Sequence, residues 1–195
     1  MKKYGKVRAK MAFIKVINEK EAAGELKKVY NQITSSRGKL SNIMKIHSLL
    51  PDTMIKHLNL YMSIMFSKGT LTREEKEILA VVVSKNNNCD YCVNHHAEAL
   101  NHYWKNSERL NKFIDYLDDP AFSNKCRLTI KHASKLTTNP SSVLKGDIDD
   151  LRKAGWTDED ILAINLIISY FNFVNRIALG LGVEFSEEEI KGYKY

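Results

Sequence analysis

At 195 residues and 44% hydrophobic content, the chain is long enough to bury a sizeable core, and we expect one compact domain. The formal net charge of +7 does not predict a nucleic-acid partner, because five basic residues among the first ten leave only +2 for the remainder. No segment has the roughly 20 consecutive apolar residues of a membrane span, and Lys15 interrupts the apolar run that a secretory signal requires. We therefore expect a cytoplasmic protein with no nucleic-acid or membrane partner.

The basic residues set the first ten positions apart from the rest of the chain. They are Lys2, Lys3, Lys6, Arg8 and Lys10. A more ordinary sequence begins at Met11, so we expect a disordered basic leader over residues 1–10 and a single all-helical domain over residues 11–195. The helical expectation rests on only three prolines, nine glycines and few alternating runs of β-branched residues.

Helical spacing of apolar residues predicts two helices before residue 70. The first covers residues 19–35 and ends near Gly38, because glycine favours the left-handed conformation of a helix C-cap. The second begins at Pro51, since proline is tolerated in a first helical turn. Its methionines are expected to fill core space rather than to form a functional patch.

A pair of helices is predicted around the two closely spaced cysteines. Thr72 and Glu75 have the spacing of a capping box, so a helix is expected over residues 73–85. The polar residues 86–88 break it, and the next helix begins near Cys89. Because the connection is short, the two helices should fold back against each other.

Four further helices are predicted toward the C-terminus, over residues 107–117, 123–136, 147–154 and 161–181. The last is apolar on nearly all sides, which indicates the middle of a bundle or a subunit interface. Its polar residues are expected to hydrogen-bond to neighbouring helices rather than to contact substrate. They are Asn165, Ser169, Asn172, Asn175 and Arg176.

The cysteine pair carries the strongest chemical signal. Cys89 and Cys92 are three positions apart at the start of a predicted helix, whose N-terminus favours a thiolate. At about 100° per residue, Cys92 and His96 fall within about 60° of Cys89, whereas His95 points more sideways. Glu77 lies on the preceding helix, and the reversal of the chain would bring it near His96. Such a carboxylate would fix the imidazole tautomer, and the imidazole would take a thiol proton.

Zinc binding is the main alternative for these residues. A lone CxxC occurs in redox and zinc sites alike, and Cys89, Cys92, His95 and His96 offer four potential ligands. Four ligands crowded on two helical turns seldom form a tetrahedron, which favours redox chemistry. The third cysteine, Cys126, is expected to be an inert core residue.

The spacing of Glu77, Cys89, Cys92 and His96 resembles the signature of the alkyl hydroperoxidase D-like proteins within the carboxymuconolactone decarboxylase superfamily. The segments MAFIKVI, SRGKLSNIMKIHSL, CDYCVNHHAEAL and SYFNFVNRIALGLGVE look like its uncharacterised peroxidase-related subgroup. The similarity covers nearly all of residues 11–184. It implies an all-helical bundle that forms homo-oligomers, with the CxxC at the N-terminus of a central helix and neither a metal nor an organic cofactor.

The resemblance also implies roles for the matched residues. Cys92 would attack the peroxide, and Cys89 would resolve the resulting sulfenic acid into a disulfide. His96 and Glu77 would relay the proton. The superfamily's decarboxylases lack this cysteine pair, so lactone decarboxylation is not expected.

One departure from the family pattern concerns the residue between the cysteines. Well-studied members carry a second histidine there, whereas this chain has Tyr91. Tyrosine is a poor base at neutral pH, so the role of that histidine is absent or passes to His95 or to Tyr91 as a hydrogen-bond donor.

The function expected from the sequence is therefore a thiol-dependent peroxidase. It would reduce hydrogen peroxide or organic hydroperoxides through a dithiol/disulfide cycle, and an external dithiol would restore the thiols. Two alternatives stay open. The protein could be a thiol-disulfide oxidoreductase that passes electrons to a protein partner, or a non-enzymatic redox sensor.

Overall fold

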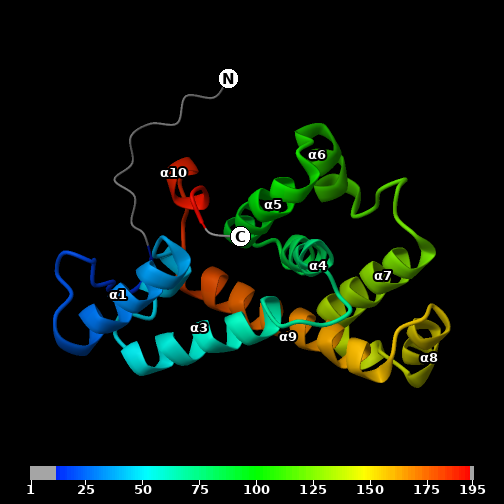
Figure 1. Cartoon of the computed structure of the whole chain (residues 1–195), viewed down its shortest axis with the longest axis horizontal. Helices are drawn as coiled ribbons and strands as arrows, with labels where there is room; N and C mark the ends of the chain where they lie inside the picture. The colour runs from blue at the N-terminus through cyan, green and yellow to red at the C-terminus, as the bar shows by residue number, and fades with distance from the viewer. Residues whose placement is uncertain (1–11, 194–195) are drawn as a thin grey trace.

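The computed structural model describes residues 12–193, and the regular structure in this range is entirely helical. The leader expected over residues 1–10 lies outside the described residues. The predicted all-helical class is confirmed (Figure 1). The helices are α1 (Gly24–Arg37), α2 (Asn42–Lys45), α3 (Pro51–Met65), α4 (Arg73–Asn86), α5 (Asp90–Trp104), α6 (Ser107–Tyr116), α7 (Asn124–Thr138), a 3-10 turn (Pro140–Ser142), α8 (Lys145–Lys153), α9 (Asp158–Leu181) and α10 (Glu187–Ile190).

Helix α4 forms the centre of the bundle. Figure 1 shows it nearly end-on, and it contacts α5, α6, α7 and α9. Its stretch from Ile78 to Val83 is apolar on consecutive positions, and every one of these residues is buried. An apolar surface on all sides of a helix requires partners on all sides, which is why α4 lies at the centre. The predicted capping box is present, since Thr72 and Glu75 satisfy each other's backbone N–H groups.

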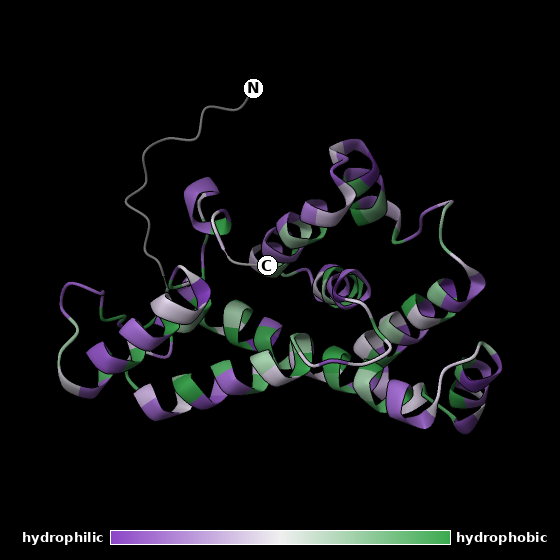
Figure 2. Ribbon diagram, viewed as in Figure 1, coloured by the Kyte–Doolittle hydropathy of each residue, from purple (hydrophilic) through white to green (hydrophobic). Residues whose placement is uncertain are grey.

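Helix α9 is the second core element. It begins at a Thr157 and Asp160 capping box and ends at Gly182, whose φ of 64° is left-handed. It packs against α3, α4 and α7, and Figure 2 shows hydrophobic residues along much of its ribbon. By length and composition it would be able to cross a membrane, but half of its most apolar window is buried within the protein.

The first predicted helix differs from the structure at its start. Helix α1 begins at Gly24 rather than at residue 19, because residues 19–21 form a turn. The backbone of Gly24 has a left-handed φ of 55°, which prevents the helix from continuing upstream. The C-terminal stop at Gly38 is confirmed, with a φ of 79°.

The apolar residues of α3 and α9 differ in exposure. Met65 and Phe171 are each 1% exposed and belong to the core of this chain. Phe173 remains 49% exposed, and it shares a face of α9 with the exposed Leu162 and Leu166. This face of α9 therefore presents apolar surface that self-association could use.

Candidate active site

A tight turn between α4 and α5 places the cysteine pair. Asn88 takes a left-handed φ of 54°, and the N–H of Cys89 donates to the carbonyl of Ser84 at 3.0 Å. Cys89 is the N-cap residue of α5, and Cys92 lies in its first turn. The two Sγ atoms are 2.6 Å apart, and the residues are 1% and 2% exposed. The CxxC therefore opens a central helix, as the sequence predicts.

The hydrogen bond between the two thiols separates their pKa values. It lowers the pKa of Cys89, and the backbone N–H of Cys92 lowers it further. The same hydrogen bond, together with burial, raises the pKa of Cys92. Negative charge in the resting pair therefore belongs to Cys89, close to the unpaired N–H groups of the helix terminus, and the remaining proton lies on Cys92.

Glu77 is fully buried in α4 and binds two cationic or potentially cationic groups. Its Oε2 accepts from His96 Nδ1 at 2.7 Å, and its Oε1 accepts from the Arg73 guanidinium at 2.6 Å. Burial acts to raise the pKa of Glu77, but His96 and Arg73 outweigh it and hold the pKa below its usual value. An ionised Glu77 keeps the proton of neutral His96 on Nδ1 and leaves Nε2 as a base.

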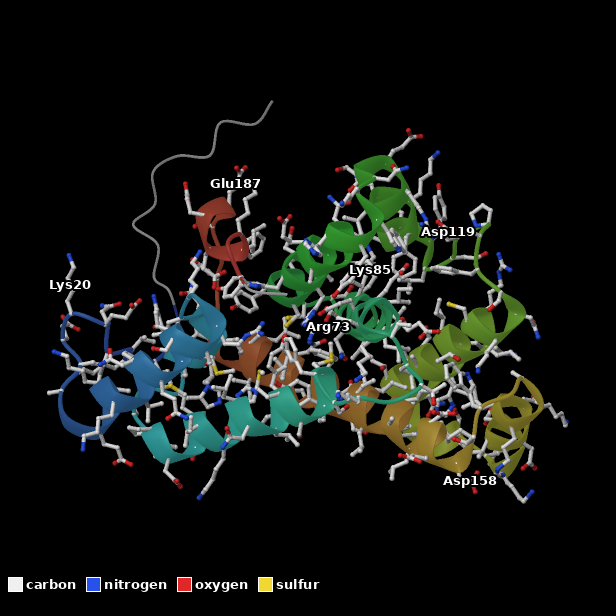
Figure 3. All side chains as sticks on the ribbon, in the orientation of Figure 1. Lys20, Arg73, Lys85, Asp119, Asp158 and Glu187 are labelled. Atoms are coloured by element: carbon white, nitrogen blue, oxygen red, sulfur yellow. The ribbon has the colours of Figure 1, made fainter. Side chains whose placement is uncertain are left out.

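A single cavity of about 100 Å³ lies beside these groups. Cys92, His96 and Glu77 line it, whereas Cys89 is not among its described lining residues. Arg73 also lines the cavity, and Figure 3 labels it near the middle of the view. A small molecule in this space would therefore meet the sulfur of Cys92, with Cys89 behind it.

Tyr91 and His95 hydrogen-bond to the C-terminal segment in this structure. His95 Nε2 lies 2.6 Å from an Oε2 atom of Glu189 in α10, and Tyr91 donates to the other oxygen at 3.3 Å. Tyr91 also accepts from the N–H of Ile43 at 3.0 Å. Burial raises the pKa of Tyr91 well above its usual value, so the phenol stays protonated. Both side chains line the cavity, but their hydrogen bonds hold α10 beside the N-terminus of α5.

The four possible zinc ligands do not converge. No group of three or more His, Cys, Asp or Glu side chains is arranged to hold a metal ion within residues 12–193. The hydrogen bonds of His95 and His96 explain this, since they lead to Glu189 and Glu77. Cys126 lies apart and half-buried, and burial raises its pKa to about 11, so its thiol is unreactive at neutral pH.

Asn175 connects the cysteine turn to α9. It is 0% exposed, and its Oδ1 accepts from Asn87 Nδ2 at 3.0 Å. Its Nδ2 donates to Ser84 Oγ at 3.3 Å. The side chain also hydrogen-bonds to Cys92 and lowers the pKa of that thiol. Asn172 and Asn175 thus bond to neighbouring helices, as expected, and Asn175 reaches Cys92, whereas Asn165 and Arg176 donate to carbonyls of α9 itself.

Replacing Asn175 by leucine is expected to slow the reaction of the cysteine pair with iodoacetamide severalfold at pH 7. The change removes a hydrogen-bond donor to Cys92 and leaves Asn87 and Ser84 without their partner, at a cost of about 1–3 kcal/mol. The pH dependence of alkylation measures the first effect, and urea unfolding measures the second. Asn165→Leu is the matched control, because Asn165 bonds to the Ile161 carbonyl of its own helix. Identical alkylation profiles for the two variants would contradict the role of Asn175.

The sequence did not predict three residues of the site. Arg73 precedes Glu77 by one helical turn, and this i,i+4 spacing was a readable signal for an ion pair. Asn175 stood out as polar in an apolar helix, but nothing in the sequence connected it to Cys92. Glu189 gave no signal, because it lies 94 positions from its partner His95.

The fold resembles that of a solved alkylhydroperoxidase AhpD core. Residues 51–135 match the model of the carboxymuconolactone decarboxylase family. This match covers less than half of the chain, and the similarity to solved structures shows a shared fold. No curated protein matches the chain.

Solved structures of the same fold cover almost the whole chain. One is an uncharacterized peroxidase-related protein with an alkylhydroperoxidase AhpD core from Ralstonia eutropha JMP134, with 23% identity, a TM-score of 0.82, and coverage of 93% of this chain and 96% of that one. Another, from Silicibacter sp. TM1040, is also called peroxidase-related and has 22% identity, a TM-score of 0.83, and coverage of 95% and 98%. The debrominase Bmp8 is 19% identical, with a TM-score of 0.74 and coverage of 94% and 99%.

Proposed function

We propose that this protein is a thiol-dependent peroxidase that reduces hydrogen peroxide or organic hydroperoxides. The observation that carries the proposal is a dithiol whose second sulfur faces a cavity shared with the Glu77 and His96 pair. The fold alone does not select the substrate, because Bmp8 is a debrominase with a similar structure. Two relatives of the same fold are described as peroxidase-related, which supports peroxide as the oxidant.

The proposed cycle uses both cysteines and balances without a cofactor. The Cys92 thiolate attacks one oxygen of the peroxide, the O–O bond breaks, and an alcohol or water leaves. This step oxidises Cys92 to a sulfenic acid. The Cys89 thiolate then attacks the Cys92 sulfur, expels water and closes the disulfide, which requires little movement because the sulfurs already touch. An external dithiol reduces the disulfide by exchange.

His96 would remove the proton from Cys92 in this cycle. The resting proton lies on Cys92, so it has to leave before Cys92 can attack. The imidazole of His96 lines the same cavity and has its basic Nε2 available, since Nδ1 donates to Glu77. His96 would accept the thiol proton and return it to the leaving oxygen, and ionised Glu77 would stabilise the imidazolium in between.

The proposed cycle requires a dithiol reductant, and the exposed surface of α9 suggests a second copy of the chain as a partner. A cytoplasmic location would supply a dithiol reductant and keep the pair reduced between turnovers. The exposed face of α9 formed by Leu162, Leu166 and Phe173 would be covered by a second copy of the chain. Size-exclusion chromatography with light scattering tests this homo-oligomer, and Phe173→Glu should dissociate it.

The test of the peroxidase is stopped-flow reaction of the reduced protein with hydrogen peroxide and with tert-butyl hydroperoxide, with thiols counted before and after. The wild type is expected to lose two thiols rapidly. Cys89→Ser should lose one and hold a sulfenic acid that dimedone traps, because Cys92 still attacks. Cys92→Ser should lose none at this rate. Cys126→Ser is the control, because that thiol lies outside the site.

The opposite results are equally informative. Trapped sulfenic acid in Cys92→Ser but not in Cys89→Ser would assign the attack to Cys89. Thiol loss in the wild type no faster than that of a free thiol at the same pH would contradict the peroxidase. Rapid exchange with a protein disulfide would then favour the electron carrier.

A further inference from the structure

Arg37 is a buried cation without an anionic partner in the wall of the cavity. It ends α1, is 9% exposed, and lines the space that Cys92 and His96 also line. Its guanidinium carbon lies 4.7 Å from the centre of the Phe66 ring and 5.4 Å from that of Tyr61. Within residues 12–193, no carboxylate or carbonyl accepts a hydrogen bond from it.

The other fixed cations of the cavity are already engaged. Arg73 donates to Glu77 and to the hydroxyl of Tyr61. Lys39 donates to backbone carbonyls around α10, among them those of Glu189 and Lys191. Among the described residues of the wall, Arg37 is therefore the cation whose donors have no protein acceptor, whereas Lys39 directs its donors to backbone carbonyls.

The partial burial of this guanidinium has a cost that a bound anion would reduce. A guanidinium has five N–H donors, and none of those of Arg37 is fully buried without a partner, so they keep some contact with solvent. Stacking on Phe66 and Tyr61 offsets part of the cost and holds the group in place. The planar fork matches a carboxylate, which takes two parallel hydrogen bonds from one guanidinium. A phosphate usually draws on several donors, and the described wall has one free guanidinium to offer.

The other residues that line the cavity favour the apolar part of a ligand. Side chains from α1, α2, α3 and α9 add aliphatic and aromatic surface to the same cavity. They include Ile33, Met44, Leu58, Phe171 and Val174. A ligand that matches these lining groups carries an acid group, an apolar body and a group that reacts with a thiol.

We propose that the cavity takes hydroperoxides of apolar carboxylic acids, with the carboxylate on Arg37 and the hydroperoxide at Cys92. This inference rests on the proposed function, since it names the substrate class of the same dithiol. Cys92 attacks the hydroperoxide, the O–O bond breaks, and the product is the corresponding hydroxy acid with Cys92 as sulfenic acid. Arg37 acts in binding and does not touch the reacting atoms.

The first experiment compares linear hydroperoxy acids of increasing length with their methyl esters. The wild type is expected to show a higher kcat/KM for an acid than for its ester. Arg37→Met should lower the acid-to-ester ratio of kcat/KM at least tenfold, because a desolvated charge pair is lost. Arg37→Gln, which keeps a polar but shorter and uncharged side chain, is the second variant and should also lower the ratio. Arg176→Met is the control, since that arginine is exposed and bonds to Asn172 of its own helix.

The second experiment separates this inference from the peroxidase. Calorimetry measures binding of the unreactive hydroxy acid and of its methyl ester to wild type and Arg37→Met. Tighter binding of the acid that Arg37→Met abolishes would support the carboxylate site even if no peroxide is turned over. Equal binding of acid and ester, with an acid-to-ester ratio unchanged in both Arg37 variants, would overturn the inference while leaving the peroxidase intact.

Discussion

Replacing Glu77 by alanine is expected to lower the free energy of unfolding by about 3–5 kcal/mol. Glu77 is fully buried and joins Arg73 and His96 at 2.6 and 2.7 Å. Its removal would leave a guanidinium in the interior without its carboxylate, which costs far more than the loss of an exposed ion pair. Urea unfolding followed by far-UV circular dichroism measures the change.

Two variants make this result interpretable. Glu77→Gln keeps the shape and some hydrogen bonds but loses the charge, so it should destabilise less than alanine. Glu108→Ala removes an exposed partner of Lys112, and its unfolding midpoint should stay close to that of the wild type. The expectation fails if Glu77→Ala is as mild as Glu108→Ala.

Glu77→Gln also separates stability from chemistry. A neutral amide cannot stabilise an imidazolium at His96, so the proton of Cys92 would be held more tightly. The folded variant should therefore react with peroxide about 10- to 100-fold more slowly, as expected for the loss of general-base assistance. A reaction rate equal to that of the wild type would remove Glu77 from the mechanism and leave it a structural ion pair.

The parts of the fold that were readable from the sequence are those with local physical causes. The capping box of Thr72 and the glycine stop at Gly38 each depend on residues within a few positions. The approach of Glu77 to His96 was also accessible, because a short turn between two helices leaves few other arrangements. Helical periodicity placed Cys92 and His96 on one face for the same reason.

The parts that were not readable depend on contacts between distant segments. The four-residue helices α2 and α10 have too few residues for a periodic pattern. Glu189 reaches His95 only because α10 packs on α5, and no sequence pattern near Glu189 predicts that contact. Arg37 appeared to be an ordinary basic residue at a helix end, and its burial over Phe66 emerges only from the packing of α1 beside α3.

Acid is expected to destabilise the protein through His57, by about 2 kcal/mol between pH 7 and pH 5. Burial, and then the neighbouring His47, lower the pKa of His57 from 6.5 to about 4. The side chain is 5% exposed, Nε2 bonds to the hydroxyl of Tyr170 at 2.8 Å, and Nδ1 has no partner among the described residues. A second proton would therefore enter the folded state only at a high cost.

The sign and the pH range of this effect follow from the direction of the shift. Below pH 6.5 the unfolded chain takes up a proton at His57 and the folded chain does not, so stability falls until pH reaches the folded pKa of about 4. Glu77 has a lowered pKa, so its stabilising charge is lost only as pH falls below its ordinary value of 4.5. The interval from pH 6.5 to 5 thus isolates the buried histidines, of which His47 and His132 also have lowered pKa values.

The variant His57→Phe separates the effect of His57 on acid stability from the effects of His47 and His132. Phenylalanine fills a similar volume beside the ring of Phe173, but it cannot take up a proton. Urea unfolding at several pH values should show a shallower decline for the variant, by about 2 kcal/mol at pH 5. Its stability at pH 7 should be lower, because the hydroxyl of Tyr170 loses its partner. An NMR titration of the wild-type imidazole with a midpoint near 6.5, or equal declines in both proteins, would show that His57 is open to solvent in solution.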